Sequence, residues 1–386
     1  MVSGAPELIG RYVVDRELGS GGMGEVFLAY SPAGDPVAVK LIRSDRLDPV
    51  ARDRFEKEAQ IARTIVGTNR VARFLDADPY AARPWIAMEY IPGSTLAAEV
   101  DAHGPLSVPL VASLAALLAE GLEAVHTAGL LHRDLKPQNV ILGEYGPVLI
   151  DFGLGAFLDS AKGSLSHTGM VIGTVRSMPP EQATGNPKVT PAADVYGLGA
   201  VLLYAATGHS PYDGVRWEAI ASQVADPNHL PDLGGLPAEL VPLVSSMLAY
   251  EPEVRPALSA VMTQSTGLLT EAGISPVEAR YALIDRTRED RSAAHVPAAR
   301  RDLLVRVAEK VDLSETDARL RSPLDHPPQE REPETKALPE TRSGREQPGD
   351  VDSGPAPPGG DGGKKLPASR RVAEELREQY AMRLEL

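Results

Sequence analysis

HRDLKPQN, residues 132–139, is the most informative segment of this chain. Asp151-Phe152-Gly153 follows it, 17 residues after Asp134, across a short apolar hairpin. Phosphoryl transfer requires a carboxylate at the attacking hydroxyl, a cation at the moving phosphate and oxygen ligands for Mg²⁺. Asp134, Lys136 and the pair of Asn139 and Asp151 can supply these three functions. Each residue alone is an ordinary loop or cap residue, but their order together predicts a phosphoryl-transfer site.

A second segment, Gly19-Ser20-Gly21-Gly22-Met23-Gly24-Glu25-Val26, is rich in glycine. Glycines let a turn bring backbone N–H groups close to phosphate oxygens, because no side chain stands in the way. Taken alone, the segment is equally well interpreted as a hairpin without a ligand. A dinucleotide-binding loop would need a helix directly afterward. Val26–Tyr30 has the pattern of a strand instead, which disfavours that alternative.

The third feature is a lysine on an apolar strand, in Val37-Ala38-Val39-Lys40. A solvent-facing strand lysine is the ordinary alternative. Glu58, on a helix expected over Val50–Thr64, is the obvious counter-charge for a lysine that orients nucleotide phosphates. A surface ion pair contributes only about 0–1 kcal/mol, so stability alone hardly motivates this pairing.

Composition excludes several classes of function. The 386 residues carry 39 Lys and Arg against 53 Asp and Glu, a formal charge of −14, which argues against a general nucleic-acid or anionic-membrane binder. The absence of cysteine excludes disulfides, thiolate metal sites and cysteine nucleophiles. Met1–Gly10 lacks the features of a signal peptide. Val195–Gly208, the most membrane-like run, is shorter than the roughly 20 residues of a spanning helix. We therefore expect a cytoplasmic protein with no nucleic-acid or membrane partner.

The apolar periodicity divides the chain into a β-rich part and a helical part. From Arg11 to about Tyr90 short β-like runs dominate, interrupted by the helical stretch noted above. The runs are Arg11–Leu18, Glu25–Tyr30, Pro36–Ile42, Arg70–Asp76 and Trp85–Glu89. This pattern predicts a small β-rich lobe that ends at a hinge in Ile91-Pro92-Gly93.

From Leu96 to about Leu269 the pattern is mostly helical, with two short strands at Val140–Leu142 and Val148–Ile150. One helix ends before Gly129, which stands where a C-terminal cap is expected. Further helices are expected from Ser275-Pro276 and from Pro297, each with proline near its first turn.

The end of the chain has a different composition. Pro323–Pro367 is rich in proline and glycine and is predicted to be a disordered linker. Ser369–Leu386 returns to a helix-forming pattern. A tethered element that recruits substrates or partners is one interpretation, and a solvated tail with partial helicity is the other.

Together these segments resemble the protein kinase family, in particular the eukaryotic-like serine/threonine kinases of bacteria. The resemblance covers about Arg11 to Leu269. It implies an α+β, bilobal protein-kinase fold, with a small β-rich N-lobe and a larger α-helical C-lobe, followed by a helical extension and a disordered tail. The expected parts are a leader (1–10), the N-lobe (11–90), the C-lobe (91–269), the extension (270–320), the linker (321–368) and an amphipathic helix (369–386).

The resemblance also implies a role for each matching residue. Asp134 would be the catalytic base, and Lys136 marks serine/threonine rather than tyrosine specificity. Lys40 would bind the α and β phosphates of ATP and pair with Glu58. The metal ligands would be Asn139 and Asp151, holding Mg²⁺ or Mn²⁺. The other ATP-binding positions are the glycine-rich loop, the adenine pocket, the gatekeeper and the hinge: Leu18, Gly19, Ser20, Gly21, Gly22, Met23, Gly24, Val26, Ala38, Met88, Glu89, Ile91 and Ile141.

Further positions agree with the family or depart from it. Glu181 is expected to pair with Arg255, and Asp194 to brace the backbone of the catalytic loop. Pro179 stands where the family usually has alanine, and Ser177 replaces a common tyrosine. Thr68-Asn69-Arg70-Val71 also lacks the usual His-Pro-x-Ile-Val. The Ser177 change leaves the preference for the substrate residue after the phosphorylated one open.

Activation by phosphorylation is a further expectation. Arg133 precedes the catalytic aspartate, and such an arginine can pair with a phosphate on the activation segment. Thr168 is the first candidate and Ser166 the second, at the spacing where the bacterial family autophosphorylates. Trans-autophosphorylation would need a homodimer. The alternative is an ordinary mobile loop rich in serine and threonine.

Two other functions are alternatives to an ATP-dependent kinase that phosphorylates protein substrates. A pseudokinase, which uses the fold for binding alone, would be favoured by loss of Lys40, Asp134 or Asp151, and none is lost. A small-molecule phosphotransferase is disfavoured by the segment Thr174–Glu181 and its partner Arg255, which suit a peptide-docking surface.

Overall fold

The computed structural model describes residues 6–21, 24–42, 49–65, 68–151, 175–186 and 189–286. Two compact units divide the chain, Met1–Leu324 and Asp325–Leu386, and the second lies outside the described residues. The predicted helix from Pro297, the linker and the C-terminal helix therefore lie outside them too.

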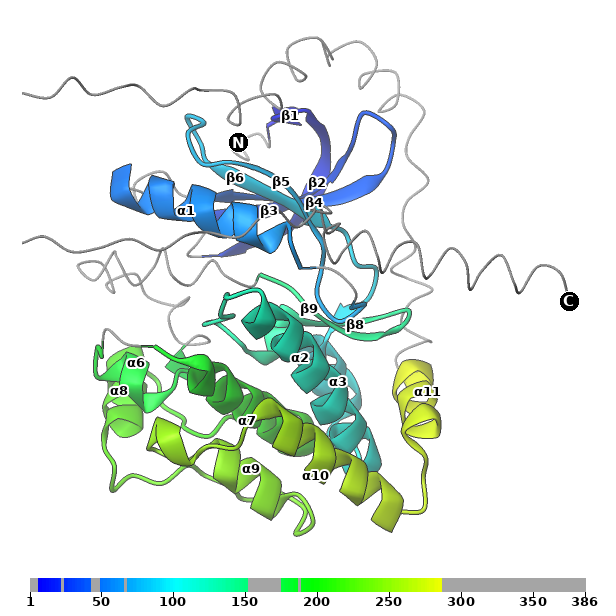
Figure 1. The fold of residues 1–386 in the computed structure, drawn as a ribbon, viewed down its shortest axis with the longest axis vertical. Helices are drawn as coiled ribbons and strands as arrows, with labels where there is room; N and C mark the ends of the chain where they lie inside the picture. The colour runs from blue at the N-terminus through cyan, green and yellow to red at the C-terminus, as the bar shows by residue number, and fades with distance from the viewer. Residues whose placement is uncertain are drawn as a thin grey trace, which may run out of the picture. The chain divides into compact units, whose positions relative to one another are not determined.

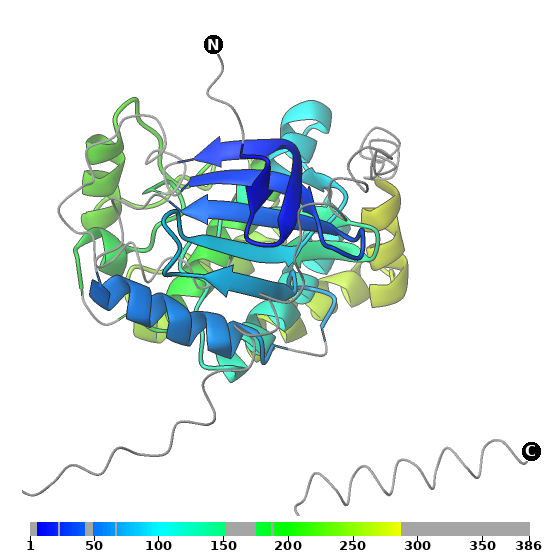
Figure 2. The same ribbon diagram turned by 90° about the horizontal axis from the view of Figure 1, so that it is seen from above.

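The N-terminal part is a six-stranded antiparallel sheet with the order β1-β2-β3-β4-β6-β5 and one helix beside it (Figures 1 and 2). Its elements are β1 (Leu8–Ile9), β2 (Tyr12–Gly21), β3 (Gly24–Tyr30), β4 (Pro36–Ile42), α1 (Pro49–Ala62), β5 (Phe74–Asp78) and β6 (Trp85–Glu89). The expected leader thus contains β1, which pairs with β2.

The register of the strands sorts their side chains between the two faces of the sheet. Val26 lies opposite Lys40, and Ala38 opposite Met88. Because directly paired residues project to the same face, these four side chains share one face. Ile86, the other partner of Lys40, packs against Phe55 of α1. Lys40 therefore projects to the side of the sheet that carries α1.

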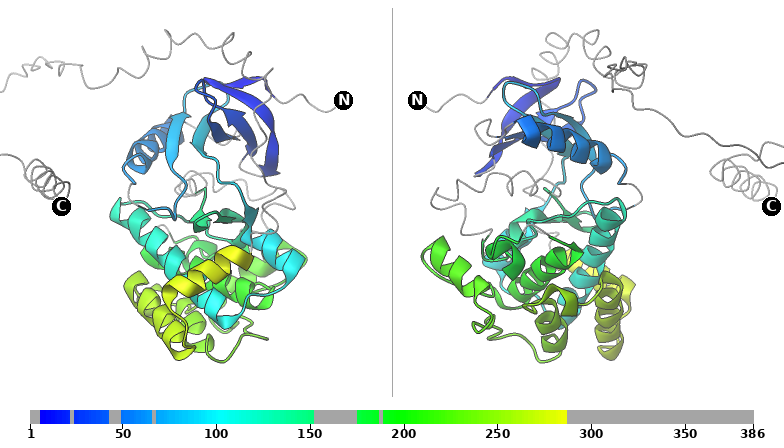
Figure 3. Two further views of the ribbon diagram at one scale, coloured as in Figure 1. Left: turned by 90° about the vertical axis from the view of Figure 1, so that its right-hand side faces the viewer. Right: turned by 60° about the vertical axis from the view of Figure 1, so that its left-hand side comes forward.

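The helical part contains a small three-stranded sheet and the main helices (Figures 1 and 3). Its elements are β7 (Ser94–Thr95), α2 (Leu96–His103), α3 (Val108–Thr127), η2 (Pro137–Asn139), β8 (Val140–Gly143), β9 (Gly146–Leu149), α6 (Pro180–Ala183), α7 (Pro191–Thr207), α8 (Trp217–Ala225), α9 (Val241–Met247), η3 (Pro252–Val254), α10 (Leu258–Glu271) and α11 (Pro276–Arg286). This β-rich and helical division is the fold that the sequence predicts.

Helix α3 is the centre of the helical core and leads to the 132–139 segment. Leu114, Leu118 and Leu122 repeat at four-residue spacing and are fully buried. Among the described residues α3 is the one helix long and apolar enough to span a membrane, and 56% of that stretch is buried inside the fold. The Val195–Gly208 run, by contrast, forms most of the buried helix α7.

A Schellman cap ends α3, as the position of Gly129 predicts. Gly129 has a φ of 81°, its N–H donates to the carbonyl of His126, and the N–H of Leu130 donates to Val125. The chain therefore leaves the helix in a fixed direction, immediately before residue 132.

The predicted strand Arg70–Asp76 is displaced in the structure. β5 begins only at Phe74, because the backbone before it bonds elsewhere. Leu149 of β9 donates to the carbonyl of Arg70 at 2.7 Å and accepts from the N–H of Ala72 at 2.9 Å. This short contact joins the end of β9 to the chain entering β5, so it links the two sheets.

Helix α11 follows the helical core and packs against α3 and β9 (Figure 3). Arg280 donates to the carbonyl of Tyr145 at 3.0 Å, in the turn between β8 and β9. Arg286 lies 3.4 Å from the carboxylate of Glu99, which is fully buried on α2. The described part of the helical extension is therefore fixed to the domain.

Candidate active site

Lys40 is the cation of the site. Its side chain is only 6% exposed, and its Nζ lies 2.7 Å from Oδ2 of Asp151, a residue 111 positions later. The strand register described above explains why the Lys40 side chain projects in this direction, because it places Lys40 on the α1 side of the sheet. Glu58 lies half-buried on α1, and its pairing with Lys40 stays a prediction.

Asp134 lies at the centre of a second set of contacts. Its Oδ2 accepts a hydrogen bond from Nζ of Lys136 at 2.7 Å and another from Nδ2 of Asn139 at 3.1 Å. The same Nδ2 also donates to the carbonyl of Asp134 at 2.7 Å. These bonds fix the carboxylate, which is 8% exposed, beside an ammonium group. A hydroxyl at this carboxylate could be oriented and deprotonated.

Asp194, on α7, holds the backbone of this loop in place, as the sequence predicts. One carboxylate oxygen accepts from the N–H of His132 at 2.8 Å, and the other accepts from the N–H of Arg133 at 2.8 Å. His126, in the last turn of α3, lies 2.7 Å from the first oxygen. Burial alone would raise the pKa of Asp194, but the hydrogen bond from His126, the two imidazoles and the N–H of Arg133 outweigh it. The pKa therefore lies below its ordinary value, and Asp194 stays ionised.

Asp151 and Asn139 fit the requirements of a Mg²⁺ site. Burial would raise the pKa of Asp151, yet the charge and hydrogen bond of Lys40 bring it below its ordinary value, so the carboxylate stays anionic. The carboxamide nitrogen of Asn139 faces Asp134, which leaves its oxygen without a hydrogen bond in the described part of the chain. The N–H of Ile150 donates to the carbonyl of Asn139 at 3.0 Å and ties the two segments together. Two oxygen ligands suit a metal that completes its shell with water and phosphate.

The residues predicted to contact the nucleotide lie on β2, β3, β4, β6 and β8. Val26, Ala38 and Met88 are half-buried and share the sheet face of Lys40. Leu18 is 38% exposed on β2, and Ile141 is half-buried on β8. The remaining described positions are Gly19, Ser20 and Gly21 on β2, Gly24 on β3, Glu89 at the end of β6, and Ile91 between β6 and β7.

Gly24 shows why the glycine-rich segment needs this residue. Its φ is 152°, and a Cβ there would lie 1.7 Å from the carbonyl oxygen of Leu41 on β4. Any side chain would therefore push β3 away from β4. Gly22 and Met23 lie outside the described residues, as do the phosphorylation candidates Ser166 and Thr168.

The predicted pair of Glu181 and Arg255 is confirmed. The guanidinium donates to both carboxylate oxygens, at 2.7 and 2.8 Å. It also stacks over the ring of Tyr196, with 5.0 Å to the centroid. The pair anchors α6, and with it the chain that approaches Asp134.

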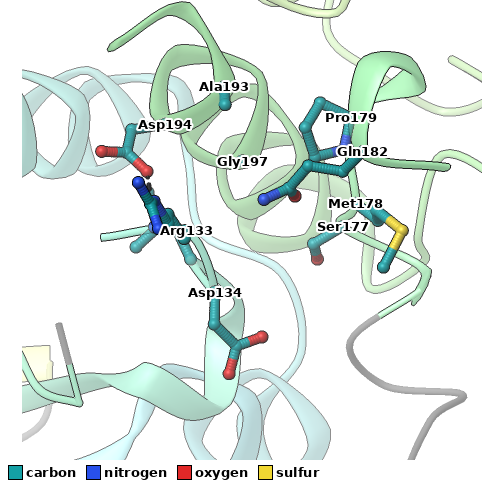
Figure 4. A pocket seen from close by; sticks show the side chains of 10 residues that line it. Arg133, Asp134, Ser177, Met178, Pro179, Gln182, Ala193, Asp194 and Gly197 are labelled. Atoms are coloured by element: carbon teal, nitrogen blue, oxygen red, sulfur yellow. Dashed lines mark hydrogen bonds between the residues drawn. The ribbon is translucent and has the colours of Figure 1, made fainter. Parts of the chain in front are cut away.

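Sequence reasoning missed two features of the site. The first is His126, for which a histidine in the last turn of a helix, six residues before His132, is a usable signal. Gln182 was also missed. It lines a pocket beside Asp134 together with Ser177 (Figure 4), and nothing in its local pattern marks it.

Comparison with known proteins gives one consistent result. The protein kinase domain family matches residues 12–265. The probable serine/threonine-protein kinase PkwA of Thermomonospora curvata is 44% identical over 262 residues, which is 68% of this chain and 34% of that protein. The serine/threonine-protein kinase AfsK of Streptomyces griseus is 39% identical over 317 residues, 78% of this chain and 38% of that protein. The chain spans about a third of the length of these relatives.

A solved structure has the same fold. The kinase domain of PknI from Mycobacterium tuberculosis superposes with a TM-score of 0.51 at 24% sequence identity, covering 68% of this chain and 99% of that one.

Proposed function

Because the chain belongs to the protein kinase family, we propose that it transfers the γ-phosphate of Mg-ATP to serine and threonine hydroxyls of proteins. One observation carries the proposal. Lys40, from the N-terminal sheet, lies 2.7 Å from Asp151. Asn139 donates to Asp134, and its carbonyl accepts from the N–H of Ile150, the residue directly before Asp151. Charges that would otherwise be costly to bury are gathered at one place.

The chain's own residues divide the work among three positions. Asp134 would accept a hydrogen bond from the attacking hydroxyl and take up its proton. Lys136, 2.7 Å from that carboxylate, would stabilise negative charge on the moving phosphoryl group. Lys40 would bind the phosphates of ATP. Asn139 and Asp151 would hold Mg²⁺, which neutralises charge on the phosphates when bound.

Labelled ATP gives a direct test. The purified chain, incubated with Mg²⁺ and a mixture of protein substrates, should transfer label to serine and threonine. Asp134→Asn removes the general base and should lower the rate by about 10²–10⁴, and Lys40→Met should also abolish labelling. Lys57→Met, at an exposed position on α1, is the matched control. Equal labelling by wild type and both site variants would mean that another kinase is responsible, and the proposal would fail.

We also infer that the chain phosphorylates its own activation segment, at Thr168 first and Ser166 second. The inference is supported by Arg133, which directly precedes Asp134 and could pair with a phosphate there. Phosphopeptide mapping after incubation with ATP locates the site. Mixing wild type with a tagged Asp134→Asn chain separates the two routes, because label on the tagged chain requires transfer between two copies. An active enzyme whose Thr168 and Ser166 stay unmodified would refute the inference.

A further inference from the structure

Helix α11 has apolar side chains on two faces, and only one face is packed. Figure 1 shows α11 at the outer edge of the helical part. Ala279 and Leu283, one turn apart, are buried against the helical core. Val277 and Tyr281, also one turn apart, are 62% and 63% exposed. Two positions along an α-helix correspond to about 200° around its axis, so the exposed pair lies on the face opposite the buried pair.

A third exposed apolar side chain belongs to the turn that is bonded to this helix. Tyr145, between β8 and β9, is 58% exposed, and its carbonyl accepts from Arg280 of α11 at 3.0 Å. Single exposed apolar residues are ordinary, but a group of them marks an interaction surface. We call Tyr145, Val277 and Tyr281 the α11 surface.

The chain itself contains a segment that suits this surface. Residues 297–311, PAARRDLLVRVAEKV, lie outside the described residues, and their sequence predicts a helix that begins at Pro297. The large apolar residues of that helix recur at a spacing that places them on one side: Leu303, Leu304, Val307 and Val311. Such a stripe needs an apolar partner.

The connection between the two helices is long enough for a hairpin. Ten residues, 287–296, separate α11 from the segment. An extended chain of that length reaches about 33 Å, whereas an 11-residue helix such as α11 is about 16 Å long. The segment can therefore turn back along α11. In an antiparallel pair Leu303 would lie beside Tyr281. Val307 would lie beside Val277, because each pair of residues is four positions apart.

Charge also favours this segment. It has four basic and two acidic residues, a net charge of +2 in a chain whose net charge is −14. The exposed acidic residues next to the α11 surface are Glu144, which precedes Tyr145, and Glu278, which follows Val277. The two arginines of α11 are already bound to the domain, as described above. The segment therefore offers cations where the surface offers carboxylates.

The other predicted helix, 369–386, is a poorer occupant. It has four basic and four acidic residues, so its side chains carry no net charge. It is also separated from α11 by the 82 residues 287–368. Effective concentration falls with roughly the −3/2 power of linker length, so the ten-residue connection favours the nearer segment by a factor of about 20.

We propose that residues 297–311 form a helix that docks on the α11 surface of the same chain. The folded domain then extends well beyond residue 265, where the match to the kinase family ends. The linker rich in proline and glycine leaves the domain from this docked helix. Docking needs neither nucleotide nor phosphoryl transfer, so it is independent of the proposed kinase function.

Because the chain has no cysteine, pairs of introduced cysteines test the docking in the full-length protein. A disulfide forms where two Cα atoms are about 4.4–6.8 Å apart. Under mild oxidation, Val277→Cys/Val307→Cys should form an intramolecular disulfide, seen as a shifted monomer band on a non-reducing gel and located by mass spectrometry. Leu230→Cys/Val307→Cys is the matched control, because Leu230 is exposed beyond α8, and it should stay reduced.

The same gel distinguishes the other occupants of the α11 surface. If Val277→Cys/Leu376→Cys formed the disulfide and Val277→Cys/Val307→Cys did not, the 369–386 segment would be the occupant. If Val277→Cys/Val307→Cys gave mainly a disulfide-linked dimer, the surface would join two copies of the chain. Either result would overturn the proposal.

Hydrogen exchange measures the docking without cysteines. Burying one valine or leucine side chain shifts an equilibrium by a factor of at least about 10. The amides of residues 297–311 should therefore exchange at least about tenfold more slowly in wild type than in Val277→Asp/Tyr281→Asp. Val215→Asp, at an exposed valine before α8, is the matched control and should keep the protection. Urea unfolding verifies that each variant is folded. Equally fast exchange in wild type and in the double variant would show that the segment does not dock.

Discussion

Arg255→Lys is the substitution whose cost can be worked out most directly from this structure. The guanidinium makes five hydrogen bonds: two to Glu181 and one each to the carbonyls of Ala249, Tyr250 and Ala192. The side chains of Arg255 and Glu181 are 0% and 5% exposed, so water cannot replace a lost bond.

The magnitude follows from the number of donors. Lysine keeps the positive charge but has three donors on one nitrogen, so at least two of the five acceptors lose their partner. Hydrogen bonds to charged groups contribute about 1.5–3 kcal/mol each. We therefore expect the free energy of unfolding to fall by about 3 kcal/mol or more.

Urea unfolding followed by circular dichroism measures this loss as a lower midpoint with an unchanged slope. Arg83→Lys is the matched control, because Arg83 pairs with Glu25 at the surface, where both side chains are about half exposed. Exposed pairs contribute about 0–1 kcal/mol. If Arg255→Lys destabilised the chain no more than Arg83→Lys does, the hydrogen bonds of the buried Arg255 guanidinium would not anchor α6, and the reasoning would be wrong.

Three further predictions concern other parts of the domain. Asp194 has a pKa below its ordinary value. Its contribution to stability is therefore complete above the unfolded-state pKa of about 3.9 and is lost as the pH falls through the lower folded-state pKa. In urea titrations between pH 2.5 and 6, the free energy of unfolding should fall less steeply with decreasing pH in Asp194→Asn than in wild type. Gly24→Ala places a Cβ against the carbonyl of Leu41, so calorimetry should show weaker ATP binding and a lower melting temperature, whereas normal binding would contradict the strained contact. Arg286→Ala removes a cation from the buried carboxylate of Glu99 and should lower the free energy of unfolding by about 1–3 kcal/mol, while no loss would show that α11 is not held by this pair.

The sequence was sufficient for most of the elements and for the set of chemical groups. Periodicity located the strands at Pro36–Ile42 and Trp85–Glu89, because alternation on a half-buried sheet is a local property. Gly129 predicted the end of α3 because a left-handed cap favours glycine. These features depend on neighbouring residues only.

Features set by long-range pairing were less accessible. The shift of β5 to Phe74 results from hydrogen bonds between Arg70 and Leu149, which are 79 residues apart. The local sequence pattern contains no information about that pairing, and the residues around Arg70 have the pattern of a strand. The local sequence pattern does not predict the pocket at Gln182 either, because the residues that line it come from three separate segments.

Backbone strain connects the fold to the site. In the described part of the chain, the non-glycine residues with positive φ are Arg133, at 62°, and Asp151, at 61°. Such conformations cost of order 1–3 kcal/mol each and persist only where the surroundings hold them. Asp194 holds Arg133 through a backbone hydrogen bond, and Lys40 holds Asp151 through an ion pair. Lys40 thus restrains the proposed metal ligand Asp151 in addition to its proposed role of binding phosphate. It follows that the activity lost in Lys40→Met measures both roles together and cannot be assigned to ATP binding alone.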